Sequence, residues 1–228
     1  MGKNHIKSLN APPTWEFCRK ENTFITRPNS GAHTLDHTFS ISFLLKHVLN
    51  IANTLKEVKH ILHEGNLFVD GKKVHDEKAQ VGLMDVVSFP KTKQHFRVLL
   101  TQKNKLCAVK IDEKEAGFKI VKIKSKTTNP KNKTQLNCTS GRNILVEKDT
   151  YKTGESIVLQ LPSQKISESL PFKEGSIVLL TNGNKAGTVG KLKKIEGNTI
   201  QVQADTEFET QKIHAFVIGK EKSIIKTE

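Results

Sequence analysis

The hydrophobic residues between positions 38 and 65 recur with a helical period, and the pattern predicts two short amphipathic helices. In the first helix, apolar side chains lie three or four positions apart and Lys46 falls between them, so one face can be buried while the other meets solvent or a ligand. The second helix has sharper limits, because Thr54 and Glu57 form a capping-box pattern and Gly65 can end the helix. The basic residues on its polar face are Lys56, Lys59, His60 and His63.

After the second helix the period changes to two residues. Residues 67–69, the turn Asp70-Gly71 and residues 72–74 predict a hairpin, because an Asp-Gly pair between apolar runs favours a two-residue turn. The sequence GLMDVVSF, residues 82–89, continues as a further strand. Two helices followed by a small basic hairpin form the plan of a compact module that binds an RNA backbone. We expect this module over residues 38–91.

Residues 92–168 show a wholly β pattern and predict a small barrel or curled sheet. Near residue 122, Val121 and Ile123 alternate with lysines, so a strand would bury this pair and present the ammonium groups on its other face. No acidic residue occurs between Ala116 and Val146, which favours contact with a phosphate backbone. The basic candidates here are Lys122, Lys124, Lys126, Lys131, Lys133 and Arg142. A lysine-guarded edge strand would explain the strand lysines equally well.

Residues 169–220 repeat the β pattern on a new core. The sequence GSIVLLTNGNKAGTVGKLKKI, residues 175–195, is similar to a KOW motif, the strand-loop-strand element of an SH3-like barrel. Gly187 and Gly190 stand where that motif needs room for the backbone. The loop residue Lys185 is a candidate for RNA contact, and a solubilising surface lysine is the alternative. Residues 221–228 form a short tail.

Residues 1–37 have little periodicity and combine basic residues with Pro and Gly turn signals. Such a segment buries little apolar surface by itself, so we expect an extended basic arm that stays disordered unless it lies against a partner. Trp15 can anchor the arm, and packing on the globular part of this protein is favoured over stacking on an RNA base. For the basic residues of the arm, RNA contact and a solvated tail both stay open.

The charge of the chain favours a polyanionic partner. The formal net charge is +14, the pI is near 9.7, and basic residues occur in every predicted module. Only four of the 37 basic residues are Arg, which suits point-charge contacts to phosphates more than bidentate contacts to base edges. An AT-rich genome, which favours Lys codons, would explain the same bias.

Other kinds of site find little support. No apolar run approaches the roughly 20 residues of a membrane-spanning helix, and the N-terminus lacks a signal-peptide core, so we expect a cytoplasmic protein with no membrane partner. Three distant Cys residues favour neither a disulfide framework nor a zinc site. Without a Gly-rich cofactor loop or clustered carboxylates, we expect no enzyme, cofactor, metal or small-molecule substrate. Asp85, at the mouth of a predicted strand, is assigned a hydrogen-bonding role.

Several segments, in the same order along the chain, resemble known RNA-binding modules. Residues 38–89 are similar to an S-four-type RNA-binding domain, and residues 1–220 resemble the S-four-e family of small-subunit ribosomal proteins, found in archaea and eukaryotes. Further supporting pieces are GKNHIKSLNAPPTW near the start, RPNSGAHTL from Arg27, SGRNI from Ser140 and AFVIGK from Ala215. The resemblance implies an N-terminal extension along ribosomal RNA, an S-four-type domain, a central β domain and a KOW barrel.

The family resemblance also implies which residues contact RNA. They are Lys3, Lys7, Arg27, His33, Lys46, Lys56, Lys59, Arg142 and Lys185. The chain departs from the family in the arm, where Asn4, Ser8, Asn10 and Thr34 occupy polar neutral places and Asp36 adds an acid, so we expect fewer contacts there. The tail has no Trp or Gly-Lys-Gly ending of the kind that many eukaryotic members show, which favours an archaeal source.

The predicted fold is an α+β chain of several modules: an extended N-terminal arm, a small α/β S-four-type domain, a central β domain and a C-terminal SH3-like barrel. The predicted function is that of a structural constituent of the small ribosomal subunit. Its expected partners are small-subunit ribosomal RNA, bound mainly through the phosphate backbone, and neighbouring ribosomal proteins, and it would support subunit assembly and translation. The alternative is an RNA-binding accessory factor in RNA modification, transcription or translation.

Overall fold

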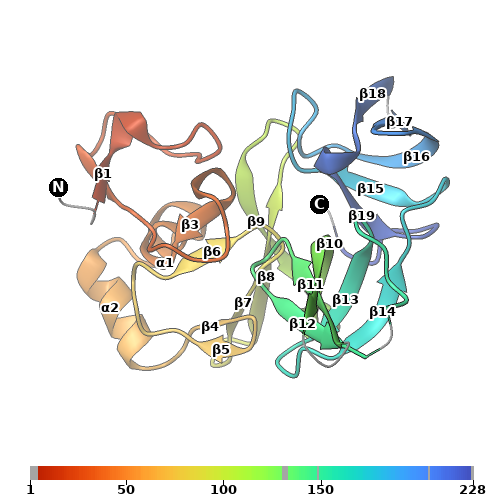
Figure 1. Cartoon of the computed structure of the whole chain (residues 1–228). Helices are drawn as coiled ribbons and strands as arrows, with labels where there is room; N and C mark the ends of the chain where they lie inside the picture. The colour runs from red at the N-terminus through yellow and green to blue at the C-terminus, as the bar shows by residue number, and fades with distance from the viewer. Residues whose placement is uncertain (1–4, 130–132, 148, 205, 227–228) are drawn as a thin grey trace. The chain divides into compact units, whose positions relative to one another are not determined.

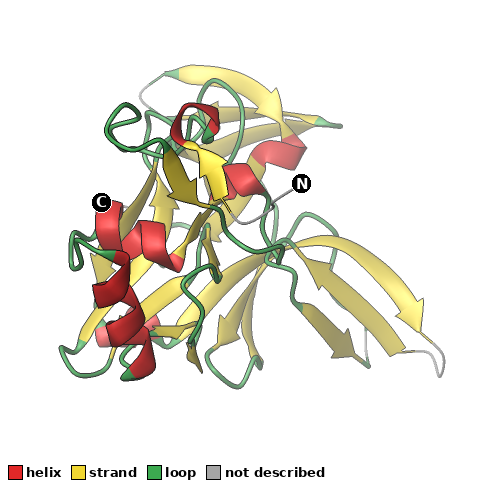
Figure 2. Ribbon diagram, turned by 90° about the vertical axis from the view of Figure 1, so that its left-hand side faces the viewer, coloured by secondary structure: helices red, strands yellow, loops and turns green. Residues whose placement is uncertain are grey.

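The computed structural model describes residues 5–129, 133–147, 149–204 and 206–226. The chain forms two compact units: unit 1 comprises Met1–Leu99 and Lys105–Gly117, and unit 2 comprises Leu100–Asn104 and Phe118–Glu228. Strands dominate both units and the helices are short (Figures 1 and 2). Within the described ranges, no helix has the length and apolar character that crossing a membrane requires.

Unit 1 contains both of the helical segments that the pattern predicts. They are α1 (Ile41–Phe43), which continues into a π-helical turn (Leu44–Val48), and α2 (Leu55–His63). The Thr54 hydroxyl oxygen accepts the Glu57 N–H at 3.3 Å, and the Glu57 carboxylate accepts the Asn53 N–H at 2.8 Å. The inner face of α2 buries Val58 and Leu62. The predicted capping box is therefore confirmed. Of the apolar stripe predicted for this helix, Val58 and Leu62 are buried, whereas Leu55 is 39% exposed.

Unit 1 also holds a five-stranded sheet. In spatial order its strands are β5 (Lys72–Lys73), β4 (Phe68–Val69), β7 (Val86–Phe89), β8 (Gln94–Leu100) and β9 (Leu106–Ile111), and the short α3 (Glu113–Ala116) follows β9. Asp70 and Gly71 form the β4–β5 turn with φ angles of 50° and 75°, as the Asp-Gly pair predicts. Strands β8 and β9, which the pattern assigned to the central β region, join this sheet, so it crosses the expected limit at residue 91. The domain limits themselves stay predictions.

The described N-terminal residues pack on the helical part of unit 1 and are not an extended arm. Their elements are β1 (His5–Lys7), a 3-10 turn (Ser8–Asn10), β2 (Phe24–Thr26), a second 3-10 turn (Leu35–His37) and β3 (Thr38–Ser40), with β1 paired to β2 and β3 to β6 (Gln80–Gly82). Trp15 is buried, and its ring centroid lies 4.6 Å from that of Phe43 and 5.9 Å from that of Phe39. Arg19 donates hydrogen bonds of 2.7 Å to the carbonyls of Ala11 and Pro12. Aromatic packing anchors this segment despite its low apolar content, and the expected packing of Trp15 on this protein is confirmed.

The first sheet of unit 2 is built around one long strand. Its order is β12 (Asn143–Val146), β11 (Lys133–Cys138), β10 (Phe118–Asn129), β13 (Ser156–Gln160) and β14 (Ile166–Leu170). The first half of β10 pairs with β13 and the second half with β11, and the register shifts between Ile123 and Ser125. Val121 and Ile123 are buried together with Leu136, as the alternation predicts.

The second sheet of unit 2 contains the KOW-like segment. Its order is β18 (Glu207–Gln211), β17 (Thr199–Gln203), β16 (Val189–Glu196), β15 (Ile177–Leu180) and β19 (Ala215–Gly219), with a 3-10 turn (Lys212–His214) before β19. Gly187 has a φ of +84°, and a Cβ there would lie 1.9 Å from the Thr101 carbonyl oxygen. A Cβ at Gly190 would lie 2.6 Å from the Val202 side chain. Both glycines thus stand where the backbone needs room.

Candidate nucleic-acid interface

Helix α2 presents basic side chains on its exposed face. Val58 and Leu62 point into unit 1, so the helical period turns Lys56 and Lys59 outward. The Lys59 ammonium lies 3.8 Å from the Glu77 carboxylate, whereas Lys56 forms no ion pair with any residue that the structure describes. An exposed ion pair contributes only about 0 to 1 kcal/mol, so a phosphate can replace Glu77 as the partner of Lys59.

Strand β2 brings together three predicted cations that lie far apart in the sequence. Lys7 on β1 pairs with Phe24 on β2, and Arg27 directly follows β2. Lys46 lines a cavity together with Phe24 and Thr26, which places it beside the same strand. Lys7 and Arg27 are exposed, and Lys46 is half-buried. None of the three cations forms an ion pair within the described ranges, so this edge of unit 1 keeps its positive charge.

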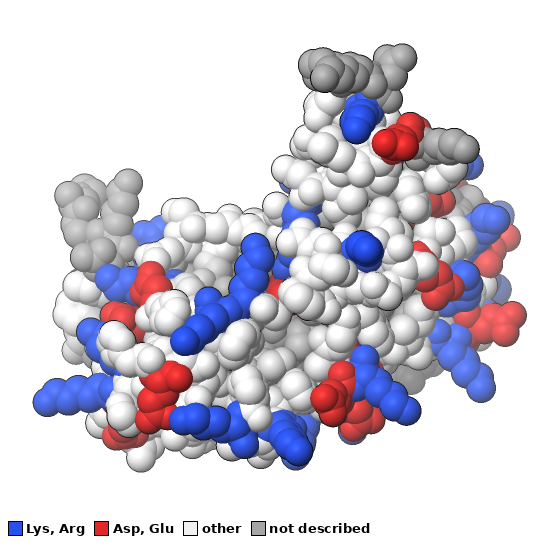
Figure 3. Space-filling view, turned by 90° about the horizontal axis from the view of Figure 1, so that it is seen from below, with Lys and Arg blue, Asp and Glu red and all other residues white. Residues whose placement is uncertain are grey.

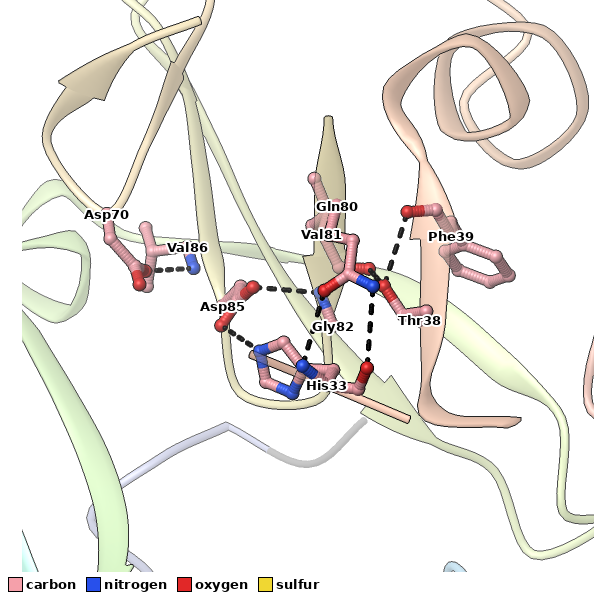
Figure 4. Close-up of polar contacts among 9 residues, drawn as sticks. All are labelled: His33, Thr38, Phe39, Asp70, Gln80, Val81, Gly82, Asp85 and Val86. Atoms are coloured by element: carbon pink, nitrogen blue, oxygen red, sulfur yellow. Dashed lines mark hydrogen bonds and ion pairs between the residues drawn. The ribbon is translucent and has the colours of Figure 1, made fainter. Parts of the chain in front are cut away.

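His33 lies in a polar network and not on the open surface. Its Nε2 lies 3.1 Å from Asp85 Oδ1, and its side chain is only 9% exposed. Asp85 Oδ2 accepts the Gly82 N–H at 2.8 Å, and the Gln80 side-chain oxygen accepts the His33 N–H at 3.2 Å (Figure 4). The network joins the segment before β3 to the strand β6 and to the turn before β7. Asp85 therefore has the predicted hydrogen-bonding role, and the geometry gives His33 a structural role.

Lys122 does not point to solvent, and the expectation that it shares a cationic face with Lys124 and Lys126 is wrong. Its ammonium donates to the carbonyl oxygens of Ala215 at 2.7 Å, Ile213 at 2.8 Å and Lys212 at 3.2 Å. Burial lowers its pKa to about 8. The alternation of the strand is kept, but the second face of β10 is covered here by the turn before β19. The pattern of residues along one strand cannot predict this covering turn, because the turn lies about 90 positions further along the chain.

The remaining lysines of β10 and β11 reach the surface, but two of them meet carboxylates. Lys124 is exposed and forms no ion pair within the described part of the chain. Lys126 contacts Asp149, and the Lys133 ammonium lies 3.9 Å from the carboxylate of Glu147, which is 86% exposed. Both acids come just after β12, at the end of the acid-free stretch. The antiparallel pairing of β12 with β11 brings this part of the chain back beside the lysines. Lys and Arg side chains accordingly lie among Asp and Glu over the face seen in Figure 3.

Two further candidates, Arg142 and Lys185, differ in their surroundings, and two others cannot be placed. Arg142 is half-buried, and its carbonyl oxygen accepts the Cys138 N–H at 2.9 Å. Lys185 is exposed in the loop before β16, with its ammonium 5.9 Å from the centroid of the Phe208 ring. Lys3 and Lys131 lie outside the described residues.

Two features of unit 1 were missed by the sequence patterns. Arg97 is 1% exposed; its guanidinium donates to the Glu115 carbonyl at 2.8 Å, and burial lowers its pKa to about 10. A cavity also lies between the segment from Phe17 to Thr26 and the segment from Ser42 to His47. No local period predicts the cavity, because its lining residues come from two segments about twenty positions apart.

Comparisons with known proteins match this chain to one family of ribosomal proteins. A family model described as "Ribosomal family S4e" matches residues 92–166, and one described as "RS4NT (NUC023) domain" matches residues 1–36. The chain is 37% identical over 230 residues to the "Small ribosomal subunit protein eS4" of Methanosphaera stadtmanae, covering 98% of this chain and 95% of the relative. The protein of the same name from Methanothermobacter thermautotrophicus is 36% identical over 231 residues, with the same coverage.

A solved structure shows a similar fold. The crystal structure of the "30S ribosomal protein S4e" from Thermoplasma acidophilum aligns with a TM-score of 0.73 and 28% sequence identity, covering 83% of this chain and 99% of that one. The similarity therefore includes the arrangement of strands as well as the sequence.

Proposed function

The chain belongs to the ribosomal S4e family, and on that premise we propose that it is a structural constituent of the small ribosomal subunit that binds ribosomal RNA mainly through the phosphate backbone. This is the role of a structural protein and not of an enzyme. On this proposal the protein acts on ribosomes in the cytoplasm, beside other proteins of the small subunit, and supports subunit assembly and translation.

One observation about the molecule carries the proposal most directly. Exposed cations without a carboxylate partner among the described residues occur on both units: Lys56 in unit 1, Lys124 and Lys185 in unit 2. Unpaired ammonium groups attract a polyanion and release its counterions on contact. Lys, in contrast to Arg, favours point contacts to phosphate over bidentate contacts to bases. The surface therefore suits an RNA backbone held at several separate places.

We also propose the module assignments that the sequence favours. Residues 38–91 would be the S-four-type RNA-binding domain, 92–168 the central β domain and 169–220 the KOW barrel. The capped helix α2, the hairpin β4–β5 and the glycine-dependent loop before β16 support these assignments. Strands β8 and β9 would then be shared between the first two modules.

Sedimentation of cell extracts tests the proposed function. Sucrose-gradient fractions should contain the protein at about one copy per small subunit, and a high-salt wash should not remove it. An RNA-binding accessory factor would instead sediment mainly in the free pool or leave the subunits with salt. Quantitative mass spectrometry of each fraction, scaled to other small-subunit proteins, distinguishes the two outcomes.

A further inference from the structure

The cavity in unit 1 has a mixed aromatic and basic lining. Its volume is about 90 Å³, and its lining residues are Phe17, Asn22, Phe24, Ile25, Thr26, Ser42, Phe43, Lys46 and His47. Phe24 is 54% exposed, so the cavity opens at the surface. Pockets for drug-sized ligands have volumes of about 300 to 1,000 Å³, so a whole cofactor does not fit. One planar ring, entering partly through the open side, does.

The rings around the cavity are held by their neighbours. Phe43 is buried, and its ring is stacked on Phe39 at 5.1 Å and lies edge-on to Phe17 at 5.4 Å. The His5 ring lies edge-on to the exposed Phe24 at 5.0 Å. Aromatic side chains fixed in this way bind a planar ligand with little loss of conformational entropy.

The polar groups at the cavity suit the edge of a heteroaromatic ring and an adjoining anion. Asn22 supplies an amide with donors and an acceptor. Burial first, and the neighbouring Lys46 second, lower the pKa of His47, and Glu21 opposes them. The shift favours the neutral imidazole, which offers both a donor and an acceptor. The Lys46 ammonium meets no carboxylate among the described residues and is available to a phosphate.

We propose that this cavity receives one unstacked nucleobase of single-stranded RNA, with the base against Phe24 and the adjoining phosphate at Lys46. The inference rests on the proposed function and adds a contact of a different kind to it, because stacking on an aromatic ring requires an unpaired base whereas phosphate contacts do not. Lys7, paired with Phe24 across β1 and β2, extends the phosphate path. A purely aliphatic protein side chain would leave the amide, imidazole and ammonium groups without partners.

Binding of two RNA probes to the full chain tests the inference. The probes are a short oligouridylate and an RNA duplex of the same length, each with a fluorescent end label read by anisotropy. Phe24→Ala and Phe24→Leu should each weaken oligouridylate binding by about tenfold, the loss expected for one stacked base, and leave duplex binding unchanged. Leu9→Ala is the matched control, because Leu9 is 73% exposed in the same segment but does not line the cavity.

The outcomes separate the two proposals. If the Phe24 variants bind the oligouridylate like the unaltered chain, RNA binding stands and the base-binding cavity is wrong. If the unaltered chain binds neither probe, both proposals fail. The near-ultraviolet spectrum of Trp15, which packs on Phe43, verifies that each variant is folded. In intact small subunits, ultraviolet crosslinking should attach a nucleotide to the peptide that contains Phe24; a crosslink from that peptide to a protein alone would overturn the inference.

Discussion

The surroundings of a lysine decide whether its ammonium group stabilises the protein interior or is available at the surface. Lys122 and Lys124 are two positions apart on β10, yet the first donates to three backbone carbonyls and the second is exposed. Lys122 is the last residue of β10 that pairs with β13, whereas Lys124 lies at the register shift between Ile123 and Ser125 in the part that pairs with β11. The ammonium group of Lys122 therefore forms hydrogen bonds inside unit 2, and that of Lys124 is available to a ligand at the surface.

Replacing Lys122 by Met should lower the free energy of unfolding by about 3 kcal/mol, because the carbonyls of Lys212, Ile213 and Ala215 would lose a charged donor in a buried place. The matched change Lys124→Met should alter the free energy of unfolding by less than about 0.5 kcal/mol. Urea denaturation of the full chain measures both values. If both variants changed the free energy of unfolding by the same small amount, water would be able to replace the Lys122 ammonium as the donor to these carbonyls.

Helix α2 shows how local chemistry fixes an element. Thr54 and Glu57 satisfy backbone donors at its first turn, and this reciprocal capping needs no contact with the rest of the molecule. For that reason its start could be predicted from four consecutive residues. The N-terminal residues could not be predicted in this way, because their order depends on Trp15 meeting Phe39 and Phe43, which lie more than twenty positions further along the chain.

The capping box gives a pH-dependent prediction. Hydrogen bonds first from the Asn53 N–H and then from the Thr54 hydroxyl lower the pKa of Glu57 below its usual 4.5. The stability that ionised Glu57 contributes is thus present above pH 4.5 and is lost as the pH falls through the lowered value. The melting temperatures of Glu57→Gln and of the unaltered chain should differ at pH 7 and converge in acid. Thr54→Ala, which removes an N-cap worth about 1 kcal/mol, should stay less stable at every pH.

The docking of the N-terminal residues gives a second prediction at this scale. Trp15→Ala should cost about 3 to 5 kcal/mol of folding free energy and release the segment that Trp15 anchors. In the unaltered free protein, trypsin should cut slowly at Arg19, whose guanidinium is held by the carbonyls of Ala11 and Pro12. In the variant the same site should be cut first. Rapid cleavage at Arg19 in both proteins would show that the segment is ordered only by a partner.

Across the whole molecule, the sequence predicted the helices, strands and turns better than the long-range contacts between them. The hairpin at Asp70-Gly71 and the glycine-dependent loop at Gly187 depend on short-range backbone geometry, and both appear where expected. The pairing of His33 with Asp85 and the cover over Lys122 join residues 52 and about 90 positions apart, respectively, and no local period encodes such contacts. The candidate RNA-binding residues were thus found as a class, while the structure decided which of them are available.

The presence of exposed, unpaired lysines on both units leads to a prediction about the salt dependence of RNA binding. If one RNA contacts both units, the double change Lys56→Ala with Lys124→Ala should reduce the slope of log affinity against log salt by about 1.4 to 1.8, twice the effect of one phosphate contact. Each single change should give half of that reduction. Thr128→Ala is the control, because Thr128 is exposed on the same strand as Lys124 but carries no charge. A double variant that matches one single variant would assign RNA contact to one unit alone.

The close approach of His33 to Gly82 limits how this protein can change over evolutionary time. A Cβ at position 82 would lie 2.3 Å from the His33 ring, which Asp85 holds in place. An alanine at position 82 is thus harmful while His33 is present and becomes acceptable once a smaller residue has replaced it. The order of the two substitutions matters. Lineages of this family that carry a larger residue at this position should be those that had already lost the histidine.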